Sequence, residues 1–316
     1  MPFFSIIVNC LNGEKFLREA LDSVAAQTFT DWEVIFFDNA STDHSFTIAE
    51  EYGPKIKVFR NEKTVSLGEA RQLAIDLAKG DFICFLDVDD IWIPEKLAIQ
   101  YEVMRSFTYS MGYAAISCIN DRGKFLYNQF PVHDSGTMFE KQLEHFEINI
   151  LTLVIDRDKL VRSSVRYDSS LVVSPDDDLI LRYLLLNDQC YVFKEVLAKY
   201  RVFPNSLTYK KIGLWAEERF KTLDNLINVD ADIANRFPKA FNEAKARGYY
   251  YLARFYASQK KGKDAAQAMD QAVMIDPKYR LLRTLVQYPF AWNFLHKYKG
   301  KLAPHWIKLK YKLKNY

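Results

Sequence analysis

The sequence contains little cysteine, glycine or histidine. Its 316 residues include four Cys, 11 Gly and five His. The four cysteines are far apart and form no CxxC pair: Cys10, Cys84, Cys118 and Cys190. Three of them lie in apolar, strand-like runs, so we expect buried, reduced thiols in a cytosolic protein and no disulfide framework.

Several short functional motifs are also missing. The sequence has no GxGxxG, GxxxxGKS/T, HExxH or GxSxG motif, which argues against glycine-rich phosphate loops, a zinc-protease helix and a serine-hydrolase elbow. No basic leader precedes the first apolar run, and no apolar run approaches the roughly 18 residues that a membrane-spanning helix needs. We therefore expect a protein that is neither secreted nor membrane-spanning.

Charge is divided unevenly along the chain. Residues 1–205 carry 21 Lys and Arg against 31 Asp and Glu, whereas residues 206–316 carry 22 against nine. Such a split suggests separate partners for the two parts. After Asp276 no acidic residue remains, and ten Lys and Arg are interleaved with Tyr, Phe and Trp.

Residues 278–316 are therefore predicted to form a basic, aromatic-rich amphipathic tail. Apolar groups in the headgroup boundary and basic groups on anionic lipid would give peripheral contact with a membrane. The alternative is a solvated basic helix that docks through its aromatic residues. Nucleic acid would attract the same charge, but we do not expect it as a partner.

Short apolar runs alternate with helical patterns through the first two thirds of the chain. Strands are predicted at 3–8, 32–37, 56–59, 82–86, 113–119, 151–155 and 190–200. Helices are predicted at 16–24, 68–79 and 94–106. This alternation indicates an α/β fold with a mostly parallel, mixed sheet. After residue 208 the strand signals stop and helical patterns follow.

The apolar run at 82–86 stops at three carboxylates, Asp87, Asp89 and Asp90. In open α/β sheets, ligands bind at the carboxyl ends of the strands, and acids this close repel one another unless a cation lies between them. Mg²⁺ or Mn²⁺, held by one or two carboxylates, completes its shell with water and substrate phosphates. This edge therefore predicts a metal–diphosphate site. In the structural alternative, Asp90 caps the next helix and the other two acids are turn residues.

Polar segments also follow the predicted strands at 3–8 and 32–37. Side chains in such segments can bind a base or ribose or cap the next helix. Six segments then resemble family 2 glycosyltransferases in order and spacing: Ser5–Leu17, Gln27–Phe29, Trp32–Ile35, Asp38–Asp43, Ala70–Arg71 and Leu86–Asp90. The resemblance implies a nucleotide-sugar fold of the GT-A, Rossmann-like type. It also implies an inverting mechanism and a nucleotide sugar donor, usually a UDP-sugar.

The resemblance implies a set of donor-binding residues: Asn9, Cys10, Leu11, Asn12, Glu14, Asp38, Asn39, Gly68, Arg71, Asp87 and Val88. Asp87 would contact the ribose or the metal's water, and Asp89, together with Asp87, would hold the Mn²⁺ or Mg²⁺ that bridges the diphosphate. Leu11 stands where the family often has Tyr. For Arg71 the alternative is a solvated helix residue.

Residues 172–182 resemble the family segment in which a Glu-Asp pair precedes a Leu-rich helix carrying Arg. Alignment on that Leu and Arg places the family's general base on Asp176 and its Glu on Pro175. Neighbouring acids raise one another's pKa, as a base requires, but such a run also suits a helix N-terminus. We take Asp176 as the base and Asp177 as the second candidate, and we expect Asp178 to cap the helix.

A later segment departs from the family pattern. Phe203 stands where family members often have a His near the metal or diphosphate. Two residues earlier, Arg201 either helps to hold the phosphates or makes a structural salt bridge.

Residues 244–277 resemble one tetratricopeptide-type helical hairpin, with small residues on its second helix. One such unit cannot bury its own face, so it should dock on neighbouring helices, on the catalytic domain or on a second subunit, which would give a homodimer. The predicted domains are a GT-A catalytic domain at 1–208, a helical domain at 209–277 and the tail at 278–316.

These features predict a metal-dependent, inverting glycosyltransferase that acts in the cytoplasm, at the inner face of the cell membrane. It would move a sugar from a nucleotide diphosphate sugar to a hydroxyl of a glycan, lipid-linked or cell-surface polysaccharide acceptor. The alternatives are a peptide or protein glycosyltransferase that uses the helical repeat, a nucleotidyltransferase, and a non-catalytic nucleotide-binding interaction protein. Pro175 and Phe203 favour the last of these.

Overall fold

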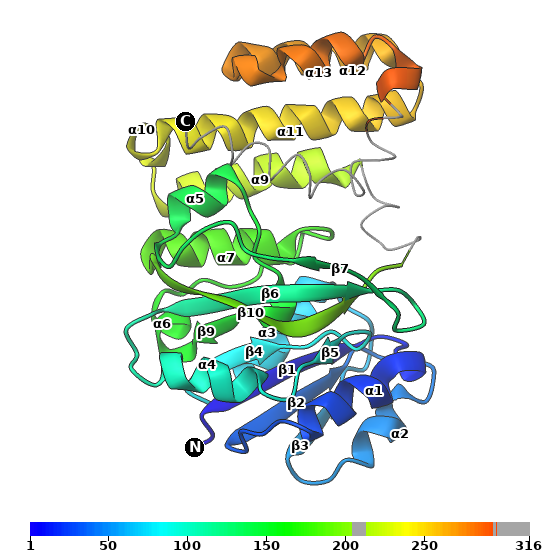
Figure 1. Ribbon diagram of the computed structural model, residues 1–316, viewed down its shortest axis with the longest axis vertical. Coiled ribbons are helices and arrows are strands. Elements are labelled where there is room, and N and C mark those ends of the chain that lie inside the picture. The colour runs from blue at the N-terminus through cyan, green and yellow to red at the C-terminus, as the bar shows by residue number, and fades with distance from the viewer. Residues whose placement is uncertain (204–212, 293–294, 296–316) are drawn as a thin grey trace.

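The computed structural model of the chain describes residues 1–203, 213–292 and 295. Within them, a ten-stranded mixed sheet forms the centre of the N-terminal part (Figure 1). Its main path is β3-β2-β1-β4-β9-β6-β10-β5, with β7 beside β6 and β8 beside β10. The strands are β1 (Phe4–Cys10), β2 (Trp32–Asp38), β3 (Ile56–Arg60), β4 (Phe82–Phe85), β5 (Ile91–Trp92), β6 (Met111–Ile119), β7 (Phe125–Gln129), β8 (Gly136–Thr137), β9 (Val154–Asp156) and β10 (Gln189–Arg201).

The sheet is parallel where the site is built and mixed elsewhere. Strands β1 to β4 are parallel to one another, and β10 runs parallel to β6. Strands β5, β7, β8 and β9 pair antiparallel. The predicted α/β class with a mixed sheet and a helical C-terminal part is confirmed.

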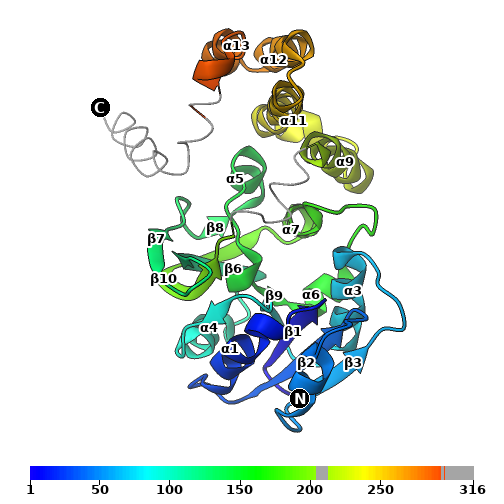
Figure 2. The same ribbon diagram turned by 90° about the vertical axis from the view of Figure 1, so that its right-hand side faces the viewer.

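Helices cover both faces of the sheet, because alternate residues of the buried strands point to opposite sides. Ile6 and Val8 pack in one apolar cluster and Ile7 in the other. The first cluster includes α1 (Glu14–Ala25), α2 (Ser45–Glu50) and α4 (Lys96–Met104). The second includes α3 (Leu67–Leu77), α5 (Phe139–Glu144), α6 (Arg157–Arg162) and α7 (Pro175–Leu186). Figure 2 shows α1 and α4 on one side of the sheet and α3 and α6 on the other.

The C-terminal helices stack on α5 and α7 (Figure 1). They are α9 (Leu214–Val229), α10 (Ile233–Arg236), α11 (Pro238–Ser258), α12 (Gly262–Ile275), the 3-10 turn η2 (Pro277–Tyr279) and α13 (Arg280–Leu285). Leu223 and Leu226 of α9 and Phe241 of α11 are buried in the same cluster as α7. The sheet and the first C-terminal helices therefore share one core.

A separate apolar cluster holds the last helices together. Small residues of α12, such as Ala265 and Ala268, pack against α11, as expected for a helical hairpin. Tyr279, Val286 and Trp292 are buried in the same cluster, so the described start of the predicted tail packs on protein. Residues 293–294 and 296–316 lie outside the described residues, so membrane contact through them stays a prediction. In the described part of the chain, no helix has the length and apolarity needed to cross a membrane.

One predicted strand is wrong in its first half. Residues 150–152 form a 3-10 turn, η1 (Ile150–Thr152), because the side chain of Asn149 accepts the N–H of Leu151 at 3.0 Å. Only Val154–Asp156 are extended, as β9. The prediction of buried, unpaired cysteines is confirmed for all four.

Gly80 lets the α3–β4 connection pass close to β1. A Cβ at position 80 would lie 2.5 Å from the backbone N of Ser5 and 2.7 Å from the carbonyl carbon of Phe4. We expect Gly80→Ala to lower the free energy of unfolding by about 1–3 kcal/mol, because backbone atoms would have to move. Urea unfolding measures this change.

Gly262→Ala is the matched control, since a Cβ there would meet no atom within 4 Å. It lies at the start of α12, where alanine should change stability by less than about 1 kcal/mol. An equal loss of stability in both variants would contradict the close approach at Gly80.

Candidate active site

The residues selected from the sequence gather at the carboxyl ends of the parallel strands. Asn9 lies near the end of β1, Asp38 ends β2 and Asp87 follows β4. Two helices meet this edge: α3 carries Arg71, and α7 carries Asp176 in its first turn. The fold thus brings together residues that are 105 positions apart in the sequence.

Arg71 is the centre of this cluster. Its side chain is only 3% exposed; Nη1 donates to Asp176 Oδ2 at 2.5 Å and Nη2 donates to Asp87 Oδ1 at 2.6 Å. Burial would lower the pKa of the guanidinium, but the charges of Asp176 and Asp87 outweigh it and raise that pKa well above its ordinary value. Arg71 is therefore a permanent cation inside the site, and the alternative of a solvated helix residue is wrong.

The carboxylate of Asp176 is fixed from a second side by Tyr167. The buried hydroxyl of Tyr167 donates to Asp176 Oδ1 at 2.7 Å, and the backbone N–H of Tyr167 donates to Gln72 Oε1 on α3 at 3.0 Å. Burial, followed by the charge of Asp176, raises the pKa of Tyr167 well above its ordinary value, so the phenol remains a donor. Each carboxylate oxygen of Asp176 keeps a lone pair for another proton donor.

Gly68 allows α3 to approach this segment closely. A Cβ at position 68 would lie 3.3 Å both from the Cβ of Pro175 and from Cδ1 of Tyr167. Pro175 is the first residue of α7, where its missing N–H removes no helical hydrogen bond. The residue that departs from the family pattern is thus well placed structurally. Donor contact by Gly68 stays a prediction.

Three acids follow β4, and each has a different environment. Burial, followed by the charge of Asp87, raises the pKa of Asp89 to about 6. Asp90 is 2% exposed, and burial and its two acidic neighbours raise its pKa well above its ordinary value. Its Oδ1 accepts the backbone N–H of Arg201 at 2.7 Å. Asp90 therefore fixes the end of β10, and the alternative that it caps the next helix is wrong.

Arg201 holds this acidic turn in place. It is 3% exposed; its Nε donates to the carbonyl of Asp89 at 2.8 Å, and its Nη2 pairs with Glu19 at 2.6 Å. Its guanidinium and the ring of Phe203 both pack against Phe16. The structural reading of Arg201 is the correct one, and the hydrophobic contact with Phe16 accounts for a phenylalanine at position 203.

The carboxylates that follow β4 fit a divalent cation only if water and a diphosphate supply its remaining ligands. Among the described residues, no group of three or more His, Cys, Asp and Glu side chains could hold a metal ion. Asp87 lies close enough to Asp89 for its charge, after burial, to raise the pKa of Asp89, and Mg²⁺ or Mn²⁺ needs only one or two carboxylates when water and phosphates complete its shell. The residues fit a cation that arrives with a diphosphate.

The polar loops that follow β1 and β2 bind to each other. Asn12, with a positive φ of 56°, donates its N–H to Ser41 Oγ at 2.9 Å, and its Oδ1 accepts the N–H of Thr42 at 2.8 Å. The carboxylate of Glu14 accepts the N–H of His44 at 3.0 Å. These contacts hold the two loops together, so Asn12 and Glu14 have a structural role. Contact of either residue with a nucleotide sugar donor stays a prediction.

Asp38 and Asn39 also hold the protein together. Asp38 is fully buried, accepts the N–H of Ser41 at 3.2 Å and pairs with Arg60 at 3.2 Å. Asn39 exchanges two hydrogen bonds with the backbone of Val65, at 2.9 and 3.0 Å, and so fixes the segment that enters α3.

The remaining loop residues line the same edge. Leu11 is 48% exposed, the thiol of Cys10 is buried, and the side chain of Val88 packs over Gly13. Donor binding by Leu11, Cys10 and Val88, like that by Asp38 and Asn39, stays a prediction.

Asn9 has an unexplained buried amide. Both its Oδ1 and its Nδ2 are shielded from solvent and have no hydrogen-bond partner in the described structure. Asn9 lies two residues after Ile7 on β1, so its side chain points to the same side of the sheet as Ile7, which is the side that α3 covers. A buried amide without partners is costly, so a ligand that supplies them would bind here favourably.

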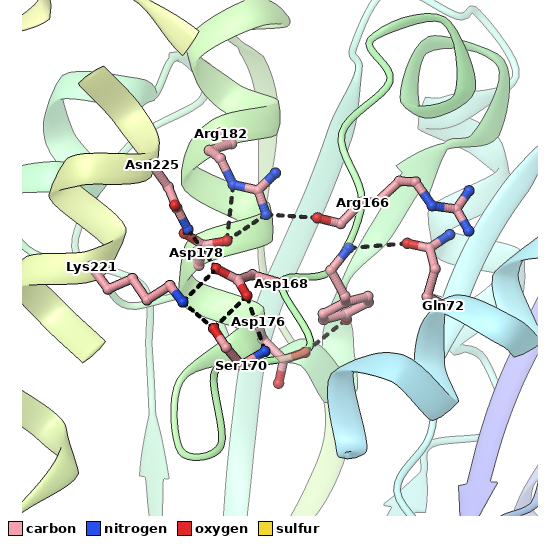
Figure 3. Close-up of polar contacts among 10 residues, drawn as sticks. Gln72, Arg166, Asp168, Ser170, Asp176, Asp178, Arg182, Lys221 and Asn225 are labelled. Carbon is pink, nitrogen blue, oxygen red and sulfur yellow. Dashed lines mark hydrogen bonds and ion pairs between the residues drawn. The ribbon is translucent and has the colours of Figure 1, made fainter. Parts of the chain in front are cut away.

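The two acids after Asp176 point away from the strand ends. Asp177 lies 3.5 Å from Arg219 of α9, and burial raises its pKa to about 6. Asp178 pairs with Arg182 and accepts a hydrogen bond from Asn225 at 2.9 Å (Figure 3). The expectation that Asp178 caps α7 is wrong, because its carboxylate is used in these side-chain contacts.

Geometry separates the two candidate bases. A raised pKa favours Asp177, but only Asp176 shares contacts with Arg71 and so with Asp87. We give position more weight, since a base has to reach the reacting atoms first.

Sequence reasoning missed two residues that support the base. Tyr167 gave no signal, because one tyrosine in a loop is not distinctive. Glu218 of α9 is 4% exposed and accepts hydrogen bonds from the backbone just before α7. It lies on the same helical face as Thr222 and Leu226, which are buried. The signal for Glu218 that the sequence offered was a carboxylate on the otherwise apolar face of a helix.

Comparison with known proteins identifies the family. Residues 5–159 match the model of glycosyl transferase family 2. The chain is 35% identical over 157 residues to the Escherichia coli UDP-Glc:alpha-D-GlcNAc-diphosphoundecaprenol beta-1,3-glucosyltransferase WfgD, which covers 48% of this chain and 60% of that protein. It is 28% identical over 213 residues to the putative teichuronic acid biosynthesis glycosyltransferase TuaG of Bacillus subtilis, covering 66% and 83%. The match thus spans less than two thirds of WfgD.

Solved structures share the fold over nearly the whole chain. Staphylococcus aureus TarS 1–349, crystallised with UDP-GlcNAc, aligns with a TM-score of 0.68 at 18% identity and covers 94% of this chain and 91% of that one. The mannosyltransferase PcManGT from Pyrobaculum calidifontis, with GDP-Man and Mn²⁺, aligns with a TM-score of 0.53. The helical part is included in the likeness to TarS. Residues 5–159, just under half of the chain, are thus identified as a glycosyl transferase family 2 region.

Proposed function

We propose that the protein is an inverting glycosyltransferase that moves a sugar from a nucleotide diphosphate sugar, a UDP-sugar, to an acceptor hydroxyl. One observation carries this proposal: Asp87 and Asp176 converge on the buried cation Arg71 beside Asp89, at the carboxyl edge of the sheet. Such an edge is where α/β proteins bind nucleotides. The family match supports the same reading.

Asp176 is the proposed general base. It would accept the proton of the acceptor hydroxyl while that oxygen attacks the anomeric carbon from the face opposite the diphosphate. The Tyr167 hydroxyl keeps the carboxylate oriented. Arg71 is a strong electrostatic partner for diphosphate oxygens, so a bound donor would compete with both carboxylates for this guanidinium.

Asp89, together with Asp87, would hold Mn²⁺ or Mg²⁺ on the diphosphate. The cation would neutralise charge on the departing nucleotide diphosphate. Burial, followed by the charge of Asp87, raises the pKa of Asp89, and a cation would offset both effects. Asn9 would supply its buried amide to the nucleotide.

The acceptor class is inferred from the relatives. WfgD is named for a diphosphoundecaprenol-linked acceptor and TuaG for teichuronic acid biosynthesis, so we propose a lipid-linked or polysaccharide glycan for this chain. Residues 278–316 carry no acid. Because Tyr279, Val286 and Trp292 are buried against protein, we propose that the cytoplasmic leaflet of the membrane that holds such an acceptor is contacted through the later part of this segment.

A non-catalytic nucleotide-binding protein is the other candidate. Pro175 and Phe203 were the features in its favour. Pro175 packs against Gly68 with Asp176 still in the cluster, so the replacement of the family's Glu does not displace the proposed base. This placement favours the enzyme.

The function is tested with a panel of UDP-Glc, UDP-GlcNAc, UDP-Gal and GDP-Man in the presence of Mn²⁺. We expect one donor to be slowly hydrolysed, and to be used faster once a short-chain lipid diphosphate sugar is added as acceptor. Release of nucleotide diphosphate measures both reactions. No consumption of any donor, together with tight nucleotide binding, would favour the non-catalytic candidate.

Replacing the base should separate chemistry from binding. We expect Asp176→Asn to lower the transfer rate by about 100- to 10,000-fold and to change UDP affinity by less than about threefold. Steady-state transfer and calorimetric UDP binding measure the two effects. Asp177→Asn is the matched control and should lose less than about tenfold. The reverse order of the two variants would make Asp177 the base.

Metal binding should require the nucleotide and depend on pH. We expect Mn²⁺ to bind weakly alone, to tighten UDP binding, and to lose this effect in Asp89→Asn but not in Asp121→Asn, an exposed turn residue. Because a proton occupies Asp89 below its pKa of about 6, apparent Mn²⁺ affinity should fall roughly fourfold between pH 7.5 and 5.5. Calorimetry, corrected for free UDP–Mn²⁺ binding, measures this. Unchanged Mn²⁺ dependence in Asp89→Asn would refute the site.

A further inference from the structure

The segment that carries Asp176 to the sheet edge is held by the C-terminal helices. Residues 166–174 form a loop between α6 and α7, and α9 lies along one side of this loop while α3 lies along the other (Figure 3). On the α3 side, the loop contacts Gln72 through the backbone of Tyr167. On the α9 side, charged and polar side chains reach into it.

Glu218 makes the densest of these contacts. Its Oε1 accepts the backbone N–H of Val172 at 2.8 Å and that of Val173 at 3.0 Å. Its Oε2 accepts the N–H of Val173 at 3.0 Å, the N–H of Ser174 at 2.8 Å and the Ser174 hydroxyl at 3.0 Å. One carboxylate thus binds three consecutive backbone amides and one side chain.

The charge of Glu218 suits its location. The carboxylate is 4% exposed, so an ionised acid is stable there only because several donors surround it. It also lies at the N-terminus of α7, where the helix dipole favours an anion. Ser174, the residue before α7, makes no capping bond with its own side chain and donates its hydroxyl to Glu218 instead. A helix from another part of the chain therefore supplies the anion for this terminus.

Neighbouring residues of α9 extend the contact along the loop. Lys221 pairs with Asp168 at 3.4 Å, and Asn225 donates to Asp168 at 3.1 Å and to Asp178 at 2.9 Å (Figure 3). Arg219 lies 3.5 Å from Asp177. Helix α9 thus binds the chain on both sides of Asp176, in the loop before it and in the first turn of α7 after it.

Resting on the proposed function, we propose that Glu218 of α9 is a positioning residue of the active site. Asp176 lies two residues after Ser174, so the backbone that Glu218 fixes determines where the base carboxylate stands relative to Arg71 and the acceptor. Displacement of a catalytic group by about 1 Å can cost roughly 100-fold in rate. Glu218 touches neither Arg71 nor Asp87 and should leave donor binding unaffected.

The test compares Glu218→Gln with Glu217→Gln in the full-length chain. Gln has the same shape, but its NH₂ group would face backbone N–H donors, so about half of the contacts become repulsive. We expect Glu218→Gln to lower kcat for transfer roughly 10- to 100-fold, with donor KM and UDP affinity within about twofold. Glu217 is exposed on the same helix, and its variant should behave as the parent protein.

Two further measurements distinguish positioning from a general structural role. Hydrogen exchange should become faster in 172–174 of Glu218→Gln while α11 and the sheet remain protected. In the Asp176→Asn background, Glu218→Gln should cause almost no additional loss of transfer, since its effect acts through the base. Glu218→Asp keeps the charge and should lose less kcat than Glu218→Gln; it also decides the question if the Gln variant does not fold.

The results that would refute this inference differ from those that would refute the proposed function. If the parent protein transfers sugar and Glu218→Gln does so at the same kcat, or loses activity only through donor KM, Glu218 is not a positioning residue. If the losses in the double variant multiply, Glu218 does not act through Asp176. If the parent protein uses no donor, the proposed function itself fails, while the exchange measurement still reports whether Glu218 holds 172–174.

Discussion

The site depends on one buried guanidinium that joins two parts of the fold. Arg71 of α3 binds Asp87 at the end of β4 and Asp176 at the start of α7. Without this cation the two acids, whose side chains are 36% and 22% exposed, would repel each other, and without the acids Arg71 would be a buried, unpaired charge. The arrangement of β4, α3 and α7 is thus an electrostatic requirement as much as a packing one. The same charge balance makes the edge receptive to a diphosphate, which is the stronger ligand for a guanidinium.

The other acids near the site differ in how far they are neutralised, and burial raises the pKa of Asp89, Asp90 and Asp177. Arg201 binds the backbone around Asp89 and Asp90, and Arg182 pairs with Asp178. Asp89 keeps a raised pKa of about 6 despite the charge of Arg201, so the protein leaves it short of positive charge. Under the proposed function, the site would be completed only when a cation arrives with its phosphates, and Asp89 would then exchange a proton for the metal ion.

Sequence patterns predicted what depends on periodicity and topology. A buried strand ending in polar residues was sufficient to place Asp87 at the carboxyl edge of the sheet, whereas Asp176 lies at the start of a helix and was selected through the resemblance to the family's base segment. Patterns could not show side-chain partners: Asp38 ends a strand just as Asp87 does, yet it is fully buried and bound to its own loop. Nor could they show Tyr167 or Glu218, since both act on Asp176 through contacts made only after distant segments pack.

The division of charge along the sequence has an internal explanation. Separate partners for the acidic N-terminal part and the basic C-terminal part stay a prediction, but the two parts also bind each other where α9 and α11 meet the N-terminal part. Lys221 pairs with Asp168, and Lys239 pairs with Glu144 at 2.6 Å. These pairs lie around a shared apolar core. Such ion pairs add little stability, but they favour one docking geometry over others. A helical part that is docked in one orientation can hold a catalytic loop in register, and a flexibly tethered module could not.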